Sequence, residues 1–161
     1  MKRKVLVVDD DQYIRNSLSA ILNSEDYIVS VAEDKITALH ELKKSRPDVM
    51  LLDVNMNEKQ EGYDLANELL QSNEYNDIPV IMLTSTEIVS GNDKILDLAR
   101  KFRNNPQFDY INAILREDNK GKKILEYKSD KNGEIIQLPV YDALSKPIDT
   151  NLLLDTLRNL F

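Results

Sequence analysis

A run of four apolar residues, Val49-Met50-Leu51-Leu52, constrains the fold of this chain more than any other feature. It lies between Pro47-Asp48 and Asp53, and an uninterrupted run bounded in this way is typical of a strand buried on both faces of a parallel sheet. Asp53 then stands at the carboxyl end of that strand. Because ligands bind outside the carboxyl ends of the strands in open α/β sheets, Asp53 is a candidate site residue.

Further apolar runs alternate with segments in which apolar residues recur at helical spacing. The runs cover residues 4–8, 27–32, 79–83 and 139–144, and the segments between them carry apolar faces such as Ile14, Leu18 and Leu22. Strands alternating with amphipathic helices predict an α/β domain with a doubly wound, five-stranded parallel sheet and helices on both faces. The order expected is the flavodoxin-like 2-1-3-4-5, which puts the ends of strands one and three side by side.

Composition narrows the class of protein. A chain of 161 residues fits a single domain, and its longest apolar runs are far shorter than the roughly 20 residues of a membrane helix. The chain has no cysteine, which fits a cytoplasmic protein without disulfides or thiolate metal sites. Its net charge of -7 argues against a general nucleic-acid-binding protein, since such proteins need an excess of Lys and Arg. We therefore expect a cytoplasmic domain without a membrane span.

Polar side chains stand at the carboxyl ends of several predicted strands: Asp9 and Asp10, Asp53, Thr84, and Lys146. An aspartate at a strand end is by itself an ordinary loop residue, but the predicted strand order brings Asp9, Asp10 and Asp53 together. Carboxylates so placed repel one another unless they share a cation, and Mg²⁺ prefers carboxylate, carbonyl and water oxygens. The sequence therefore predicts a Mg²⁺ site at these aspartates.

Phosphoryl chemistry follows from the same residue types. The backbone carbonyl of Asn55 can add a metal ligand, and with Mg²⁺ screening its charge the Asp53 carboxylate can attack a phosphoryl donor and form an aspartyl-phosphate. Lys146 can then pair with one phosphoryl oxygen, and the Thr84 hydroxyl can donate a hydrogen bond to another. The pattern thus indicates a phosphoryl-accepting site.

Four motifs carry these residues in register: Val5-Leu6-Val7-Val8-Asp9-Asp10-Asp11, Leu51-Leu52-Asp53-Val54-Asn55-Met56, Pro79-Val80-Ile81-Met82-Leu83-Thr84-Ser85 and Leu144-Ser145-Lys146-Pro147. Together they resemble the receiver domain of two-component response regulators, over residues 1–86 and 139–161. The resemblance implies Mg²⁺-dependent phosphorylation of Asp53 by a histidine kinase or phosphotransfer protein, and a switch that a downstream protein reads. By position it makes Asp9 and Asp10 metal ligands, Thr84 the switch hydroxyl and Lys146 the phosphate-pairing lysine.

Two positions depart from the pattern of that family. Asn57 stands where a proline is usual, four residues after the phosphoacceptor, and the loop that follows is one residue longer, so we expect a looser loop that keeps its ligands. Ala143 stands three residues before Lys146, where an aromatic side chain usually moves as the switch hydroxyl engages phosphate. Tyr141 would share a strand face with Ala143, so we hypothesise that Tyr141 partly replaces that aromatic.

Residues 87–138 form the largest departure, because a parallel crossover needs only about a dozen residues. Two apolar patterns predict helices there: an extended fourth helix on Ile95, Leu96, Ala99 and Phe102, and another on Phe108, Ile111, Ile114 and Leu115. Residues 124–127 and 134–138, joined through Asn132-Gly133, predict a β-hairpin. We expect an inserted subdomain, within a single receiver domain 1–161, that changes the output surface beside the fourth helix and fifth strand.

The charges of this segment do not favour a nucleic-acid site. Residues 87–138 hold ten Lys or Arg and nine Asp or Glu. Because acidic residues interleave the basic ones, a solvated face is the better interpretation.

The leading interpretation is a phosphorylation-controlled binding module, not an enzyme, that acts through protein contacts or as part of a longer protein. A pseudo-receiver that works without phosphate is the first alternative; Ala143 and the insertion favour it, and the intact site residues oppose it. The enzyme alternative is a Mg²⁺-dependent phosphohydrolase of the haloacid dehalogenase type. Such enzymes usually need a second aspartate where Asn55 stands, and an amide cannot transfer that proton. The output partner and a possible homodimer stay open.

Overall fold

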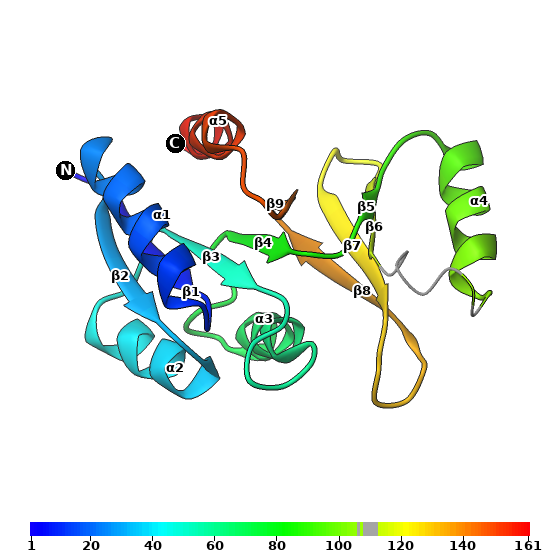
Figure 1. Ribbon diagram of the computed structural model, residues 1–161, viewed down its shortest axis with the longest axis horizontal. Coiled ribbons are helices and arrows are strands. Elements are labelled where there is room, and N and C mark those ends of the chain that lie inside the picture. Colours follow the sequence, from blue (N-terminus) through cyan, green and yellow to red (C-terminus); the bar gives the residue numbers. More distant parts are fainter. Residues whose placement is uncertain (106, 108–112) are drawn as a thin grey trace. The chain divides into compact units, whose positions relative to one another are not determined.

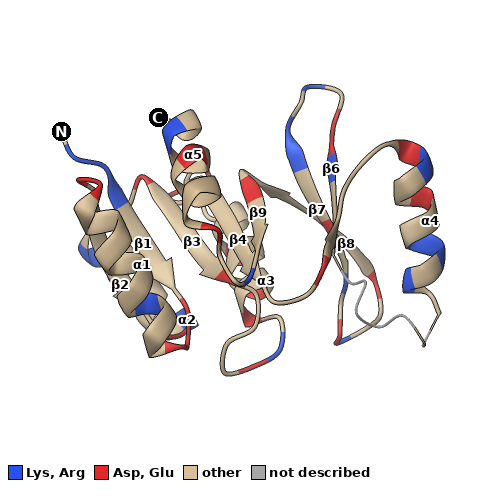
Figure 2. Ribbon diagram, turned by 45° about the horizontal axis from the view of Figure 1, so that its top comes forward, with Lys and Arg blue, Asp and Glu red and all other residues tan. Residues whose placement is uncertain are grey.

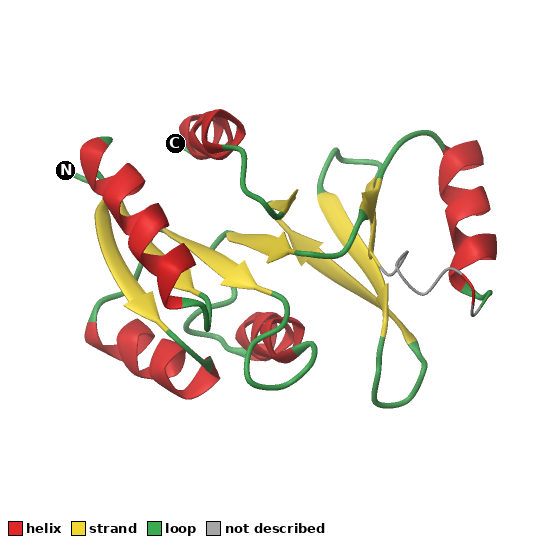
Figure 3. Cartoon of the chain, viewed as in Figure 1, coloured by secondary structure: helices red, strands yellow, loops and turns green. Residues whose placement is uncertain are grey.

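The computed structural model describes residues 1–105, 107 and 113–161, which form two compact units, Met1–Met82 and Leu83–Phe161 (Figure 1). The helices are α1 (Gln12–Ser24), α2 (Lys35–Lys44), α3 (Glu61–Gln71), α4 (Asp93–Arg103) and α5 (Thr150–Leu160). The strands, drawn in yellow in Figure 3, are β1 (Lys4–Val8), β2 (Ile28–Ala32), β3 (Val49–Asp53), β4 (Val80–Thr84), β5 (Ile88–Val89), β6 (Ala113–Glu117), β7 (Lys123–Lys128), β8 (Ile135–Val140) and β9 (Asp142–Ser145).

The described strands form two sheets. The first has five strands in the order β2-β1-β3-β4-β9, and the second has four in the order β5-β6-β7-β8. β9 is the fifth strand of the prediction, so the order 2-1-3-4-5 and the α/β class are confirmed. The second sheet was predicted only as a hairpin. β4 runs across the boundary of the two units, which falls between Met82 and Leu83.

In the unit Met1–Met82, β1 is the central strand. It pairs in parallel with β2, from Lys4↔Ile28 to Val8↔Ala32, and with β3, from Val5↔Val49 to Val8↔Leu52. Every residue of β3 is buried, and so is every residue of β1 after Lys4. Helix α1 lies on one face of these strands and α2 and α3 on the other (Figure 1). Cover on both faces explains why these runs are uniformly apolar.

Aspartates cap three of the helices. Asp11 accepts a hydrogen bond from the Tyr13 nitrogen at the start of α1, and Asp149 accepts one from Leu152 at the start of α5. Asp34 forms a capping box with Thr37, whose backbone N–H bond holds the pKa of Asp34 below its usual value. Asp11 and Asp149 are therefore the N-cap residues of α1 and α5.

In the unit Leu83–Phe161, α4 packs on the second sheet. Leu96 and Ala99 of the helix form an apolar cluster with Ile114 of β6, and Val89 packs against it. β6 pairs with β5 in parallel and with β7 antiparallel, and β7 and β8 form the predicted hairpin. Gly133 has a φ of 70° in its connection, a conformation that glycine adopts without strain.

A charge cluster formed by Arg100, Arg103 and Glu126 lies between α4 and β7. Glu126 Oε2 is 3.1 Å from Arg100 Nη2, and Glu126 Oε1 is 3.1 Å from Arg103 Nη2. Glu126 and Arg103 are buried, with only 4% and 9% of their surface exposed. Among the residues described, Arg103 Nε and Nη1 have no hydrogen-bond partner. The carboxylate of Glu126 is thus the anion that the two guanidinium groups share, and Arg100 also pairs with Asp97 at 3.0 Å.

The predicted strand 139–144 is wrong in its bounds. Pro139 and Val140 end β8, where they lie opposite Ile124 and Lys123 of β7, and β9 begins only at Asp142. Proline before an apolar run suggested a strand start. However, β8 is an edge strand, and edge strands tolerate a proline that cannot donate to a ladder. The break falls at Tyr141.

The second helix predicted in the segment 87–138 is also wrong where it can be judged. Ile114 and Leu115 lie on β6, while Phe108 and Ile111 fall outside the described residues. A short apolar run fits a buried strand as well as a buried helix, so spacing alone could not decide. The fourth helix itself is confirmed as α4.

α4 carries acidic residues only in its first half and basic residues in its last turn (Figure 2). The helix carries Asp93, Lys94, Asp97, Arg100 and Lys101 within nine positions. The expectation of a solvated face rather than a nucleic-acid site in the segment 87–138 stays a prediction. No helix among the described residues is long and apolar enough to cross a membrane.

Candidate functional site

Asp9, Asp10 and Asp53 meet at the carboxyl ends of β1 and β3, as the sequence predicted. One carboxylate oxygen from each lies within 4.8 Å of the others. Val8 and Leu52 are register partners on the adjacent strands, so the next residue on each chain segment, Asp9 and Asp53, falls at the same sheet edge. Asp9 and Asp53 are buried and Asp10 is exposed. The cluster therefore opens to solvent on the side of Asp10.

Backbone contacts fix Asp9 in this cluster. Its nitrogen donates to the Ala32 carbonyl at 3.1 Å, which extends the β1–β2 ladder by one residue. Its Oδ1 accepts from the Asp11 nitrogen at 2.9 Å, and its carbonyl accepts from Arg15 Nη1 at 2.7 Å. One carboxylate oxygen of Asp9 is thus hydrogen-bonded within the turn that leads into α1, and α1 begins directly after the site.

Gly62 makes the closest approach to Asp53. The Gly62 nitrogen donates to the Val54 carbonyl at 2.9 Å, and a Cβ placed on Gly62 would lie 1.8 Å from the backbone oxygen of Asp53. Only glycine permits this contact, because any side chain would overlap the backbone of β3. The first turn of α3 is therefore packed directly on the strand end that presents Asp53.

Side chains of the loop between β3 and α3 hydrogen-bond to its own backbone. Asn55 Oδ1 accepts from the Gln60 nitrogen at 2.9 Å, and Gln60 has a φ of 58°. The Glu61 carboxylate accepts from the Asn57 nitrogen at 3.1 Å and from the Lys35 nitrogen at 3.4 Å. These bonds restrain the loop despite the missing proline at Asn57. The proposed metal ligand, the backbone carbonyl of Asn55, stays a prediction.

Thr84 and Lys146 come together in the other unit. Thr84 ends β4 and is fully buried, and its carbonyl accepts from the Lys146 nitrogen, just after β9, at 2.7 Å. The Thr84 hydroxyl lies 2.8 Å from the hydroxyl of Thr86. Neighbouring strand ends thus present the two residues predicted to contact phosphate.

Tyr141 is not on the same strand as Ala143. Ala143 is buried on β9, whereas Tyr141 lies at the bend before it and lines a cavity of about 350 Å³ with Asp142, Thr156 and Asn159. The argument from strand alternation, which pointed Tyr141 to the side of Ala143, assumed a continuous strand and is therefore wrong. A switching role for Tyr141 stays untested.

Comparison with known proteins decides the family. The family model described as the response regulator receiver domain matches residues 5–99, more than half of the chain. The chain belongs to the response regulator receiver domain family. The match includes Asp9, Asp10, Asp53 and Thr84, and Lys146 lies beyond it. Receivers of this family are in general phosphorylation-signalling modules rather than enzymes, with a histidine kinase or phosphotransfer partner.

Relatives by sequence are response regulators. The chain is 36% identical over 90 residues to response regulator MprA of Mycobacterium ulcerans, which covers 56% of this chain and 38% of that protein. It is also 36% identical over 87 residues to response regulator MprA of Mycobacterium avium, an alignment that covers 54% of this chain and 37% of that protein. This receiver therefore spans less than two fifths of the length of these curated relatives.

Solved structures share the fold. Chemotaxis response regulator CheY4 of Vibrio cholerae matches with a TM-score of 0.62 and 24% identity, covering 100% of both chains. The signal receiver domain of an HD domain-containing protein from Pseudomonas fluorescens matches with a TM-score of 0.62 and 21% identity, covering 99% of this chain and 94% of the other.

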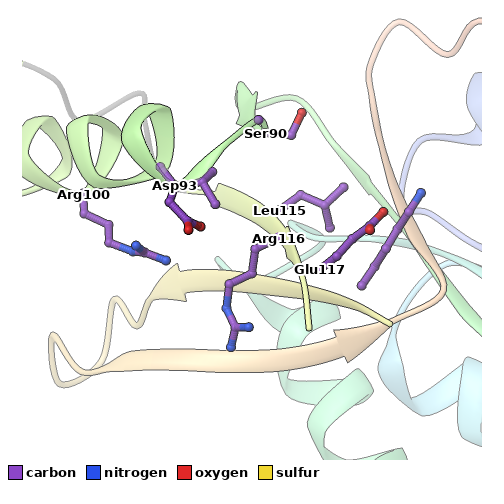
Figure 4. Close-up of a pocket in the computed structure, with 9 residues that line it drawn as sticks. Ser90, Asp93, Arg100, Leu115, Arg116 and Glu117 are labelled. Carbon is purple, nitrogen blue, oxygen red and sulfur yellow. The ribbon is translucent and has the colours of Figure 1, made fainter. Parts of the chain in front are cut away.

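A cavity of about 540 Å³ in the second unit is a weaker candidate site (Figure 4). It is lined by Arg100, Arg116 and Lys123, among others. Each of these cations already has a partner: Arg100 binds Glu126, Arg116 hydrogen-bonds to Gln137, and Lys123 lies 2.9 Å from Asp142. These three cations are therefore already hydrogen-bonded or ion-paired within the protein, which makes them less available to an anion in the cavity.

Sequence reasoning missed the packing role of Gly62 and the charge cluster of α4 and β7. A signal for the cluster was present: Arg103 continues the inward spacing of Leu96 and Ala99, and Glu126 interrupts the apolar run 124–127. Each signal can be recognised by itself, but no local pattern in the sequence shows that Arg103 and Glu126 form an ion pair.

Proposed function

We propose that Asp53 accepts a phosphoryl group from a phosphohistidine of a histidine kinase or phosphotransfer protein, and that the phosphorylated receiver changes its binding to a downstream protein. The observation that carries this proposal is the cluster of Asp9, Asp10 and Asp53 at adjacent strand ends of a receiver-family chain. A carboxylate oxygen of Asp53 would attack phosphorus as the P–N bond of the donor breaks and the imidazole leaves.

The donor set fits Mg²⁺. At bond lengths of about 2.0–2.1 Å in octahedral geometry, adjacent ligands of this ion lie about 2.9 Å apart and opposite ligands about 4.2 Å apart. The carboxylate oxygens lie within 4.8 Å of one another and would reach these spacings by side-chain rotation, for which Asp10 is exposed. Asp9, Asp10, Asp53 and the carbonyl of Asn55 would hold the ion, which supplies charge neutralisation for the incoming phosphoryl oxygens.

The roles of Thr84 and Lys146 rest on the family resemblance. Lys146 would pair with a phosphoryl oxygen through its ammonium, and Thr84 would donate its hydroxyl proton to another. Phosphorylation favours the active form only as far as these contacts are better in that form. We therefore propose that contacts of these two residues with the phosphoryl group shift the receiver toward its active form.

The proposed output surface includes α4, β9 and the second sheet. Ile95, Leu98 and Phe102 form a stripe on α4 and are 47%, 52% and 37% exposed. Exposed apolar side chains at helical spacing are suited to a protein partner. A homodimer through this face and a cytoplasmic location are further parts of the proposal.

We expect the native chain to gain one phosphoryl mass when it is incubated with Mg²⁺ and acetyl phosphate, and Asp53→Asn to gain none. An amide oxygen is too weak a nucleophile to replace the carboxylate. Intact mass spectrometry measures both. Asp155→Asn, on the exposed face of α5, is the matched control and should be phosphorylated like the native chain. Equal gain in native chain and Asp53→Asn would contradict the assignment.

We expect Asp10→Asn to weaken Mg²⁺ binding at least about tenfold, since it removes a charged ligand. Asp10 is exposed, so the fold should tolerate the change. Isothermal titration with magnesium chloride measures the affinity. Asp11→Asn is the control, because asparagine is an equally good helix cap and the residue is adjacent. Similar losses in both variants would mean that the general negative charge, and not this cluster, attracts the ion.

A pseudo-receiver is the second candidate, favoured by Ala143 on β9 and by the bend at Tyr141. It predicts a folded native chain that gains no phosphoryl mass and binds no Mg²⁺. The phosphohydrolase alternative is weaker, because Asn55 offers an amide whose oxygen is already bonded to the Gln60 nitrogen.

A further inference from the structure

The hydroxyl of Thr84 already has partners in its own turn. Its Oγ1 lies 2.8 Å from the Thr86 hydroxyl oxygen and accepts a hydrogen bond from the Thr86 backbone nitrogen at 3.1 Å. Thr84 is fully buried, and Thr86 is half-buried. Both bonds hold the Thr84 hydroxyl in one local geometry.

These bonds compete with any anion for the hydroxyl. A threonine hydroxyl has one proton to donate and two lone pairs with which to accept. A phosphoryl oxygen only accepts, so Thr84 must give it that single proton. If Thr84 donates to Thr86, the proton is already used. If Thr86 donates instead, its bond and the backbone N–H occupy both lone pairs and fix the direction of the proton.

We propose that Thr86 is a positioning residue that holds the Thr84 hydroxyl back from the phosphoryl group and so favours the unphosphorylated form of this receiver. The inference rests on the proposed function, because it assigns Thr84 a phosphoryl contact. Exchange of the Thr86 bond for the phosphoryl bond costs free energy that phosphorylation must supply before the switch moves.

The same turn leads directly to the second sheet. β5 begins at Ile88, two residues after Thr86, and pairs with β6 through Ile88↔Ala113 and Val89↔Ile114. Val89 also packs against the apolar cluster of α4. A change at Thr86 is therefore transmitted through a short segment to the proposed output surface, and release of its hydroxyl bond is a step at which that surface can respond.

The test compares the affinity of the full chain and its variants for beryllofluoride, a phosphoryl mimic, at saturating Mg²⁺. Thr86→Val removes the hydroxyl but keeps the size and the backbone N–H, whereas Thr86→Ser keeps the hydroxyl. Ser85→Ala, at the exposed neighbouring position, is the matched control. Isothermal titration calorimetry measures each dissociation constant, with Asp53→Asn as the blank.

We expect Thr86→Val to bind beryllofluoride about fivefold more tightly than the native chain, the effect of about one neutral hydrogen bond. Thr86→Ser and Ser85→Ala should stay within about twofold of native. General damage to the fold would weaken beryllofluoride binding, whereas the inference expects Thr86→Val to strengthen it. Unchanged or weaker binding by Thr86→Val, with normal binding by the native chain, overturns this inference alone. If the native chain binds no beryllofluoride, both this inference and the proposed function fail.

Discussion

Replacing Gly62 with alanine is expected to lower the free energy of unfolding by about 3 kcal/mol or more and to abolish phosphoryl acceptance at Asp53. The added Cβ would lie 1.8 Å from the Asp53 oxygen, 2.7 Å from the Asp53 carbonyl carbon and 3.0 Å from the Val54 Cα. All of these are backbone atoms of a buried strand end, which cannot rotate away. Either α3 or the end of β3 must move, and both define the carboxylate cluster. Denaturant unfolding and intact mass after acetyl phosphate measure the two effects.

Helix propensity alone predicts the opposite sign, since alanine in a helix is favoured over glycine by about 1 kcal/mol. The experiment therefore separates packing from propensity. Gly121→Ala is the control: no heavy atom of the described residues lies within 4 Å of its added Cβ, and its φ of 77° adds only the strain of a left-handed residue, about 1–2 kcal/mol. A Gly62→Ala variant as stable as the native chain would show that the close approach is dispensable.

The first sheet could be predicted because its information is local. β1 and β3 are buried on both faces, so each reads as a continuous apolar run, and each run ends in aspartate. Once the strand order is assumed, Asp9 and Asp53 must be neighbours. The β7–β8 hairpin was equally accessible, because Asn-Gly between two β-rich runs is a turn signal that acts over a few residues.

The second sheet could not be assembled from the sequence, because its information is long-range. Ile114 lies on β6 and packs on α4, and the same residue fits a helical spacing with its neighbours. Pro139 lies near the end of the edge strand β8, but a proline before an apolar run is also typical of a strand start. Gly62 faces the backbone of Asp53, which no local pattern reveals. These misses occur where tertiary packing selects between locally equivalent structures.

Replacing Glu126 with glutamine is expected to lower the free energy of unfolding by about 3–5 kcal/mol at neutral pH. The change keeps the shape of the side chain but leaves Arg100 and Arg103 without their shared anion. Arg103 is the more costly group, because its side chain is 6% exposed and its Nε and Nη1 have no hydrogen-bond partner among the described residues. Urea unfolding of the full chain, followed by circular dichroism, measures the loss.

The loss of unfolding free energy in Glu126→Gln should depend on pH. Burial by itself raises the pKa of Glu126, but the hydrogen bonds and charges of Arg100 and Arg103 outweigh it, so its pKa lies below the ordinary glutamate value of about 4.3. The unfolded chain then binds a proton at higher pH than the folded chain does. The contribution of Glu126 is therefore fully present above about pH 4.3 and is lost as pH falls through the folded pKa. We expect the difference between native chain and variant to shrink below that pH.

Two controls separate uncompensated charge from lost packing. Asp155→Asn breaks an exposed pair with Arg158, whose side chains are 66% and 58% exposed, and should change stability by less than about 1 kcal/mol. The triple replacement Arg100→Met, Arg103→Met and Glu126→Leu removes all charges of the cluster together. Because apolar groups of similar size often replace a buried ion cluster at no cost, this variant should unfold within about 1 kcal/mol of the native chain. If it is instead as unstable as Glu126→Gln, the hydrogen-bond geometry of the cluster, and not charge balance, stabilises the packing of α4 on the second sheet.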